Sequence, residues 1–155
     1  MQDTNARLRA AVNLILKGKV STAHDLITEV IAENTAEQKL KRSFDSFYGQ
    51  LKNKSKDVEL LLTFNPKAKI LGLEIIVVPN DQKRQGKGTA LIKEIIQWAT
   101  NNKCYVAVTP APIGDKSELS KTQLTDYYKK LGFKPNKGKY KNFETQKSMI
   151  LDLTQ

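Results

Sequence analysis

Residues 70–98 constrain the fold of this chain more than any other stretch. An apolar, β-branched run over 70–78 ends at a proline, which cannot donate a hydrogen bond to a strand ladder. A basic segment with two glycines follows, Gly86 and Gly88. Apolar residues then recur at helical spacing, at positions 91, 92, 95, 96 and 99. The pattern predicts a strand, a glycine loop and a helix over 86–101.

This order of elements brings free backbone N–H groups and a helix N-terminus to one point, which attracts phosphate. Glycines at 86 and 88 lack the Cβ atoms that would hold a pyrophosphate away. Lys83, Arg84 and Lys87 add positive charge. A structural turn with solvated lysines is the alternative, and the loop alone does not decide between the two.

The loop fits neither common phosphate fingerprint. It has no Gly-x-x-x-x-Gly-Lys-Ser/Thr, and Gly-x-Gly-x-x-Gly would need a glycine in place of Leu91. It resembles motif A of the GNAT superfamily of acyl-CoA-dependent N-acetyltransferases, Gln/Arg-x-x-Gly-x-Gly/Ala. Here the motif is Lys83-Arg-Gln-Gly-Lys-Gly88, with lysine at the position where the family usually has Gln or Arg.

A second block, Tyr128-Lys-Lys-Leu-Gly-Phe133, is similar to the Tyr-x-x-x-Gly-Phe that ends a late helix of the family. The tail is similar to a subgroup of small GNAT proteins from bacteria and their phages, in Asn136, Lys137, Lys141, Asn142 and Phe143. By this resemblance the tail shapes the acceptor side. The resemblance covers about residues 57–154 and leaves out the N-terminal third.

The resemblance implies transfer of an acetyl group from acetyl-CoA to a primary amine. One candidate acceptor is a protein lysine or N-terminus. The pantetheine amides would pair with the strand backbone of Ile75, Ile76 and Val77. The loop would bind the pyrophosphate through the backbone amides of Arg84, Gln85, Gly86, Lys87, Gly88 and Thr89, and Lys83 would add positive charge beside them.

Two side chains are candidates for proton transfer. The resemblance makes Tyr128 the general acid that protonates the leaving thiolate, since a phenol is a donor at neutral pH. Tyr127 is a competitor, because an error of one residue in register would exchange them. Glu74 is the candidate general base; a solvated carboxylate with ordered water relaying the proton is the alternative.

The N-terminal third is helical by pattern. Helices are expected over 5–17, 22–33 and 36–53, the third capped at Asn34 or Thr35. We expect two parts, a helical hairpin extension over 1–34 and a GNAT-like domain over 35–155. No strand is evident before residue 57, although the family normally has one there.

The remaining pattern predicts an α/β fold, and the resemblance implies a GNAT-like twisted mixed β-sheet of five to seven strands flanked by helices. A hairpin of strands over 57–64 and 70–78 leads into the loop. A parallel strand follows over 104–109, then a loop to 118 and a helix over 119–131. The last strand covers 148–153, with a shorter one over 138–143.

Composition bounds the alternatives. The net charge is +10, which favours polyanions such as nucleic acid or a phosphorylated cofactor. The lysines are spread along the chain, so nucleic acid is a less favoured partner than acetyl-CoA.

One histidine and one cysteine nearly exclude a zinc site, so no metal is expected. No apolar run approaches the ~20 residues of a membrane span, and no signal-peptide layout is evident. We expect a cytoplasmic protein. The alternative function is a basic phage-type structural or nucleic-acid-binding protein with a vestigial CoA site.

Overall fold

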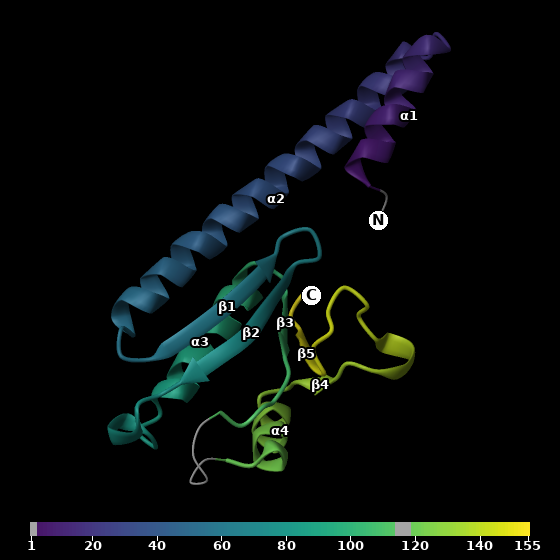
Figure 1. The fold of residues 1–155 in the computed structure, drawn as a ribbon. Helices are drawn as coiled ribbons and strands as arrows, with labels where there is room; N and C mark the ends of the chain where they lie inside the picture. The colour runs from purple at the N-terminus through teal and green to yellow at the C-terminus, as the bar shows by residue number, and fades with distance from the viewer. Residues whose placement is uncertain (1–2, 114–118) are drawn as a thin grey trace. The chain divides into compact units, whose positions relative to one another are not determined.

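The computed structural model describes residues 3–113 and 119–155, so part of the loop expected before residue 119 lies outside the described residues. The chain divides into two compact units, Met1–Arg42 and Ser43–Gln155. Its described residues form four α-helices and a five-stranded mixed sheet (Figure 1). The predicted α/β class is therefore confirmed.

The first unit is helical. It contains α1 (Thr4–Leu16) and the start of α2 (Val20–Lys54). Small residues are buried in it, Ala11 and Ala23 at 1% exposure each. The guanidinium of Arg7 on α1 contacts the carboxylates of Glu29 and Glu33 on α2.

The predicted break between helices at residues 34–35 is wrong, because α2 runs without interruption from Val20 to Lys54. The hydroxyl of Thr35, expected to cap a new helix, instead donates to the carbonyl of Ile31 at 2.9 Å. Thr28 makes the same bond two turns earlier, to the carbonyl of His24 at 2.9 Å. A threonine that bonds back to the residue four positions earlier continues a helix rather than starting one.

The second unit contains the sheet, in the order β1-β2-β3-β5-β4. As predicted, β1 (Glu59–Asn65) and β2 (Ile70–Val77) form an antiparallel hairpin. Helix α3 (Lys87–Asn101) then connects β2 to the parallel strand β3 (Tyr105–Val108), also as predicted.

The C-terminal part of the sheet agrees with expectation only in part. Strand β5 (Met149–Asp152) forms where the last strand was predicted, and it lies between β3 and the two-residue strand β4 (Lys134–Pro135), which was not predicted. The short strand expected over 138–143 is wrong: Gly138–Tyr140 is a 3₁₀ turn. The helix expected over 119–131 is α4 (Lys121–Lys130), capped by the side chain of Ser120.

An aromatic cluster joins the C-terminal part of α2 to the sheet and to α3. The Phe44 ring lies 4.8 Å from that of Phe64 on β1 and 5.6 Å from that of Trp98 on α3. The hydroxyl of Tyr48 donates to the carbonyl of Leu60 at 3.0 Å and accepts from the amide of Leu62 at 3.3 Å. Strand β1 is at the edge of the sheet, and Tyr48 satisfies part of its outer backbone.

Candidate active site

Strand β2 has two halves with different neighbours. Ile70–Leu73 pairs with β1 on one side and with β3 on the other. Beyond Leu73 the pairing with β3 ends, while the pairing with β1 continues to Val77. The register with β1 shifts at the point where the pairing with β3 ends. As a result Glu74, between Leu73 and Ile75, is passed over and has no partner residue on β1. Such a bulge bends a strand and redirects side chains beside it.

A cavity of about 400 Å³ lies where β2 and β3 separate. This is within the range of small-molecule sites, about 300–1,000 Å³. Its walls come from the second half of β2, the segment after β3, the glycine loop and α4. The lining residues are Leu73, Glu74, Ile75, Ile76, Val77, Val78, Lys83, Arg84, Val108, Thr109, Pro110, Ala111, Pro112, Ile113, Leu119, Leu124 and Tyr128.

Tyr128 is the tyrosine of α4 that lines this cavity. It is 9% exposed, and its ring packs edge-on against Phe133 at 5.3 Å. Burial, with a smaller effect from neighbouring Tyr127, raises the pKa of Tyr128 to about 12. The phenol therefore stays protonated across the physiological range and can donate a hydrogen bond into the cavity.

Tyr127 points elsewhere. It does not line the cavity, and its hydroxyl donates to the Thr89 Oγ1 on the first turn of α3 at 3.0 Å. This bond ties α4 to the start of α3. The two adjacent tyrosines therefore differ in position, and Tyr128 is the one available to a ligand in the cavity.

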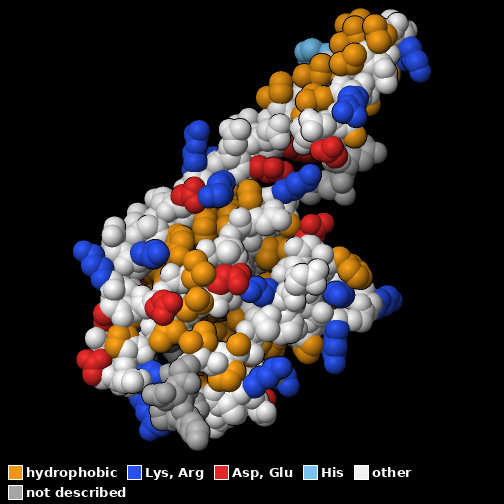
Figure 2. Space-filling model, in the orientation of Figure 1, with side chains coloured by type: hydrophobic (Ala, Val, Ile, Leu, Met, Phe, Trp, Pro, Cys, Tyr) orange, Lys and Arg blue, Asp and Glu red, His pale blue; other side chains and the backbone are white. Residues whose placement is uncertain are grey.

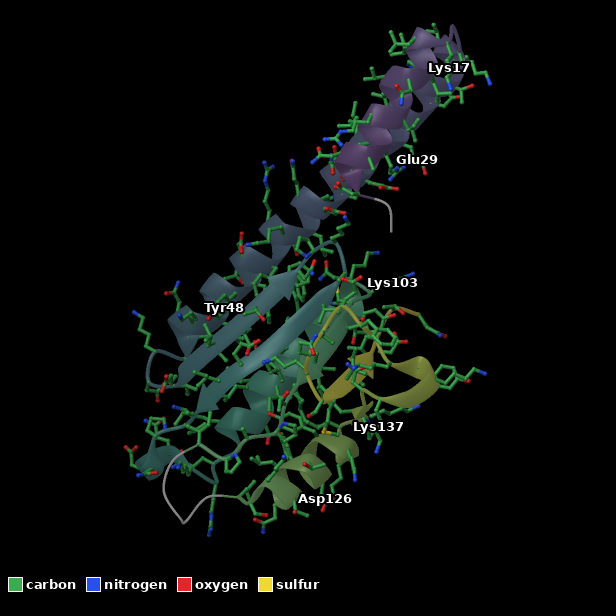
Figure 3. The ribbon with its side chains drawn as sticks, turned by 45° about the vertical axis from the view of Figure 1, so that its right-hand side comes forward. Lys17, Glu29, Tyr48, Lys103, Asp126 and Lys137 are labelled. Atoms are coloured by element: carbon green, nitrogen blue, oxygen red, sulfur yellow. The ribbon has the colours of Figure 1, made fainter. Side chains whose placement is uncertain are left out.

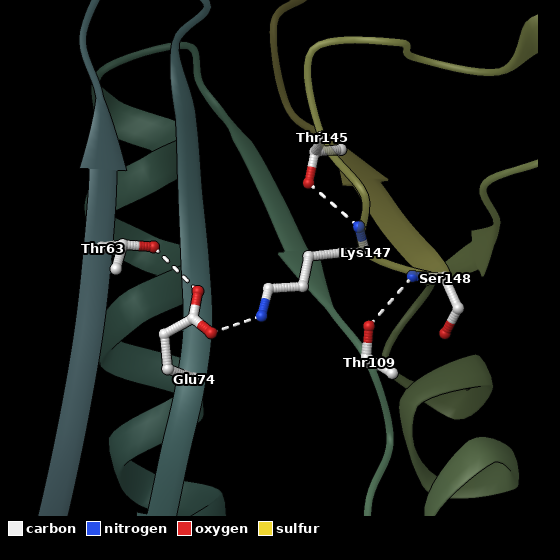
Figure 4. Close-up of polar contacts among 6 residues, drawn as sticks. All are labelled: Thr63, Glu74, Thr109, Thr145, Lys147 and Ser148. Carbon is white, nitrogen blue, oxygen red and sulfur yellow. Dashed lines mark hydrogen bonds and ion pairs between the residues drawn. The ribbon is translucent and has the colours of Figure 1, made fainter.

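Glu74 lies on the wall of the cavity and belongs to a polar network across the sheet (Figure 4). Its carboxylate accepts from the Thr63 hydroxyl at 2.9 Å and forms an ion pair with Lys147. Burial acts to raise the pKa of Glu74, but the hydrogen bonds from Lys147 and Thr63 and the charge of Lys147 outweigh it, so the pKa is lowered from its ordinary value. Glu74 is consequently ionised at neutral pH, and its basicity is moderated by Lys147.

This network includes two residues that were not predicted as site residues, Gly72 and Lys147. Gly72 faces it: a Cβ there would lie 2.4 Å from Thr63 Oγ1 and 2.8 Å from Glu74 Oε1. An isolated glycine within a strand is a known sign of close approach, so Gly72 could have been noticed. Lys147 carried no such signal, because it is 73 positions from Glu74.

The glycine loop is divided between the cavity and the helix. Lys83 and Arg84 line the cavity, whereas residues 85–89 do not. Gly86 precedes α3 with a left-handed backbone, φ 78°, as a glycine allows. Within the part of the chain that the structure describes, the backbone N–H groups of Lys87, Gly88 and Thr89 have no acceptor. Such N–H groups at a helix start are suited to bind an anion.

Lys87 does not extend toward the cavity. Its ammonium bonds to the carboxylate of Asp57 and to the side-chain oxygen of Gln82. The hydrogen bond from Lys87 is the main cause that lowers the pKa of Asp57. Of the three cations predicted around the loop, Lys83 and Arg84 therefore line the cavity and Lys87 does not. The remaining predicted residue, Gln85, donates to the carbonyl of Asp81 at 3.3 Å.

Nowhere in 3–113 or 119–155 do three His, Cys, Asp or Glu side chains gather in a way that could hold a metal. Over the same ranges, the helices are too short or too polar to cross a membrane.

Comparisons of the chain with family models, curated proteins and solved structures give no match.

Proposed function

We propose that this protein is an acyl-CoA-dependent N-acetyltransferase of the GNAT type, which transfers an acetyl group from acetyl-CoA to a primary amine. The observation that carries the proposal is the cavity between the separating parallel strands β2 and β3, with Tyr128 in its wall. The glycine loop and the start of α3 directly follow the strand that forms this wall.

The donor fits this site in three respects. Along Glu74–Val77 no strand of the described residues pairs with β2 on the side away from β1. Backbone groups on that edge can bond the amides of a pantetheine arm, as in the addition of a strand to a sheet. The lining of prolines, valines and isoleucines suits the apolar parts of that arm. The unpaired N–H groups at the start of α3, with Lys83 and Arg84, suit its pyrophosphate.

Acetyl-CoA supplies an activated thioester, so the protein must orient the amine, accept its proton and stabilise the leaving sulfur. In the proposed reaction the amine nitrogen bonds to the acetyl carbon, the carbon–sulfur bond breaks, and one proton moves from the nitrogen to the sulfur. Glu74, directly or through water, receives the amine proton. Tyr128 delivers a proton to the sulfur.

The pKa of Tyr128 refines its role. A phenol of pKa about 12 is a weaker acid than an ordinary thiol, whose reference value is about 8.5. The difference of ~3.5 units would make complete transfer to a solvated thiolate uphill by about 5 kcal/mol. The burial that raises the pKa of Tyr128 would also raise that of a sulfur beside it. Tyr128 therefore acts first as a hydrogen-bond donor to the developing thiolate, and transfer of the proton follows as the product leaves.

Calorimetric titration of acetyl-CoA into the protein tests the proposal, with 3′-dephospho-CoA as a second ligand. We expect micromolar affinity that is lost in Gly86→Glu, because the new carboxylate would occupy the anion position. Gly138→Glu is the matched control: Gly138 has a similar φ of +73°, open space around its Cβ position, and no place in the cavity. No binding at millimolar acetyl-CoA, or equal loss in both variants, would contradict the proposal.

A further inference from the structure

The segment between β4 and β5 presents two aromatic rings to solvent. We call residues 137–147 the basic aromatic loop; Lys137, at its start, is labelled in Figure 3. Tyr140 is 88% exposed and Phe143 is 79% exposed. Aromatic side chains usually bury most of their surface, so two exposed rings within four residues point to a ligand for their faces.

Lysines alternate with these rings. Lys137, Lys139 and Lys141 lie at every second position, and the one acidic residue in the loop is Glu144. The ammonium of Lys139 lies 5.7 Å from the centre of the Tyr140 ring, and that of Lys141 lies 5.2 Å from the centre of the Phe143 ring. Among the described residues, none of these three lysines forms an ion pair. Figure 2 shows Lys and Arg side chains over this side of the second unit.

The loop is held in place from within by Asn136, which is 7% exposed. Its side-chain nitrogen donates to the carbonyls of Asn142 and Lys147, at 3.1 Å each. Its side-chain oxygen accepts from the amide of Asn142 at 2.8 Å. A buried amide with satisfied hydrogen bonds fixes the backbone around it. The two rings are thus exposed on a segment whose backbone is fixed.

We propose that the basic aromatic loop binds single-stranded nucleic acid, with bases stacked on Tyr140 and Phe143 and phosphates paired with Lys137, Lys139 and Lys141. Every base has a π-face, so exposed rings bind single strands with little sequence preference. The adjacent lysines match the charge of the sugar–phosphate backbone. The resemblance led us to expect Lys137, Lys141 and Phe143 on the acceptor side, but no residue of the basic aromatic loop lines the cavity. The proposal does not depend on the acetyltransferase activity.

An acidic peptide would also be attracted by the lysines, but it would not use the faces of the rings. A duplex would offer phosphates but keep its bases stacked inside. Dependence of binding on Tyr140 and Phe143 therefore separates a single strand from both alternatives.

The test is fluorescence anisotropy with a labelled 15-nucleotide oligo-dT, in 50 and in 200 mM salt. A duplex of the same length and a poly-glutamate peptide serve as competitors. We expect Tyr140→Ala and Phe143→Ala each to weaken binding by roughly 5- to 100-fold, in proportion to the stacking of one base. Both side chains are exposed, so the melting temperature should not change.

Lys139→Gln with Lys141→Gln should lower the slope of log K against log salt by about 1.4, since each phosphate contact on a single strand contributes about 0.7. The matched control is Lys56→Gln with Lys67→Gln. These exposed lysines flank β1, at the opposite edge of the sheet, and their removal lowers the net charge by the same two units. The control should keep the slope.

Three results would overturn the proposal. One is binding that the ring substitutions leave unchanged. Another is equal loss in the two lysine pairs, which would mean that net charge alone acts. The third is displacement of the oligonucleotide by the duplex or the peptide at equal or lower concentration.

Discussion

The two halves of β2 differ in neighbours, burial and role. Ile70–Leu73 is paired on both edges and buried. Glu74–Val77 is half-buried, and in this half Ile75–Val77 is paired with β1 alone while Glu74 is passed over. The first half connects the hairpin to the rest of the sheet. The second half turns one backbone edge toward a cavity. A single strand can therefore stabilise the fold over part of its length and provide a binding surface over the rest, with the bulge at Glu74 between the two.

The largest effect should come from removing the donor at the cavity. Tyr128→Phe keeps the buried ring but deletes the hydroxyl, so the acetylation rate should fall about 10²- to 10⁴-fold. Tyr127→Phe is the matched control and loses only its bond to Thr89. Steady-state rates with a screened amine acceptor measure both. Equal rates for the two variants would remove Tyr128 from the mechanism.

One substitution made in each half of β2 compares their structural roles directly. Ile70 is 5% exposed, so Ile70→Ala should lower the free energy of unfolding by about 2–5 kcal/mol. Ile76 is half-buried on the cavity wall, so Ile76→Ala should cost less than about 1.5 kcal/mol. It should instead weaken acetyl-CoA binding.

Urea denaturation followed by the fluorescence of Trp98 gives the free energy for each variant. If the two substitutions lower the free energy of unfolding by the same amount, the two halves of β2 do not differ in their contribution to stability.

A smaller effect is expected from the ion pair beside the cavity. Lys147 holds the pKa of Glu74 below its ordinary value. In Lys147→Met its charge and hydrogen bond are lost and burial remains, so the pKa of Glu74 should rise. A base must be ionised to accept a proton, so the acid limb of the pH–rate profile should move to higher pH.

The same shift acts on stability. A lowered pKa stabilises the folded protein above the unfolded pKa of Glu74, and this stabilisation is lost as pH falls through the folded value. Lys147→Met should therefore lose less stability than the wild type on acidification. An unchanged acid limb would mean that Glu74 is not the base.

The elements that depend on local pattern were predictable. The apolar run of β2, the glycines before α3 and the periodicity of α3 each lie within a few residues, and all three elements form as expected. The break predicted in α2 was wrong, because Thr35 can cap a helix or bond back within one, and the local sequence is compatible with both.

The separation of β2 from β3 was not predictable from the residues of β2. It depends on where the pairing with β3 ends and on the register with β1, which leaves Glu74 unpaired. Both are set by other strands, not by the residues of β2. Helical spacing alone could not separate Tyr128 from Tyr127 for a related reason, and only the motif resemblance favoured Tyr128. Their difference comes from packing against Phe133 and from a bond to Thr89, 38 positions away from Tyr127.

Hydrogen exchange along β2, with and without acetyl-CoA, tests the central claim most directly. In the free protein the amides of Glu74–Val77 that β1 does not bond should exchange faster than those of Ile70–Leu73. Acetyl-CoA should slow exchange in Glu74–Val77 and leave Ile70–Leu73 unchanged. Equal protection of both halves in the free protein, or no change on adding acetyl-CoA, would contradict the assignment of the second half of β2 as the binding edge.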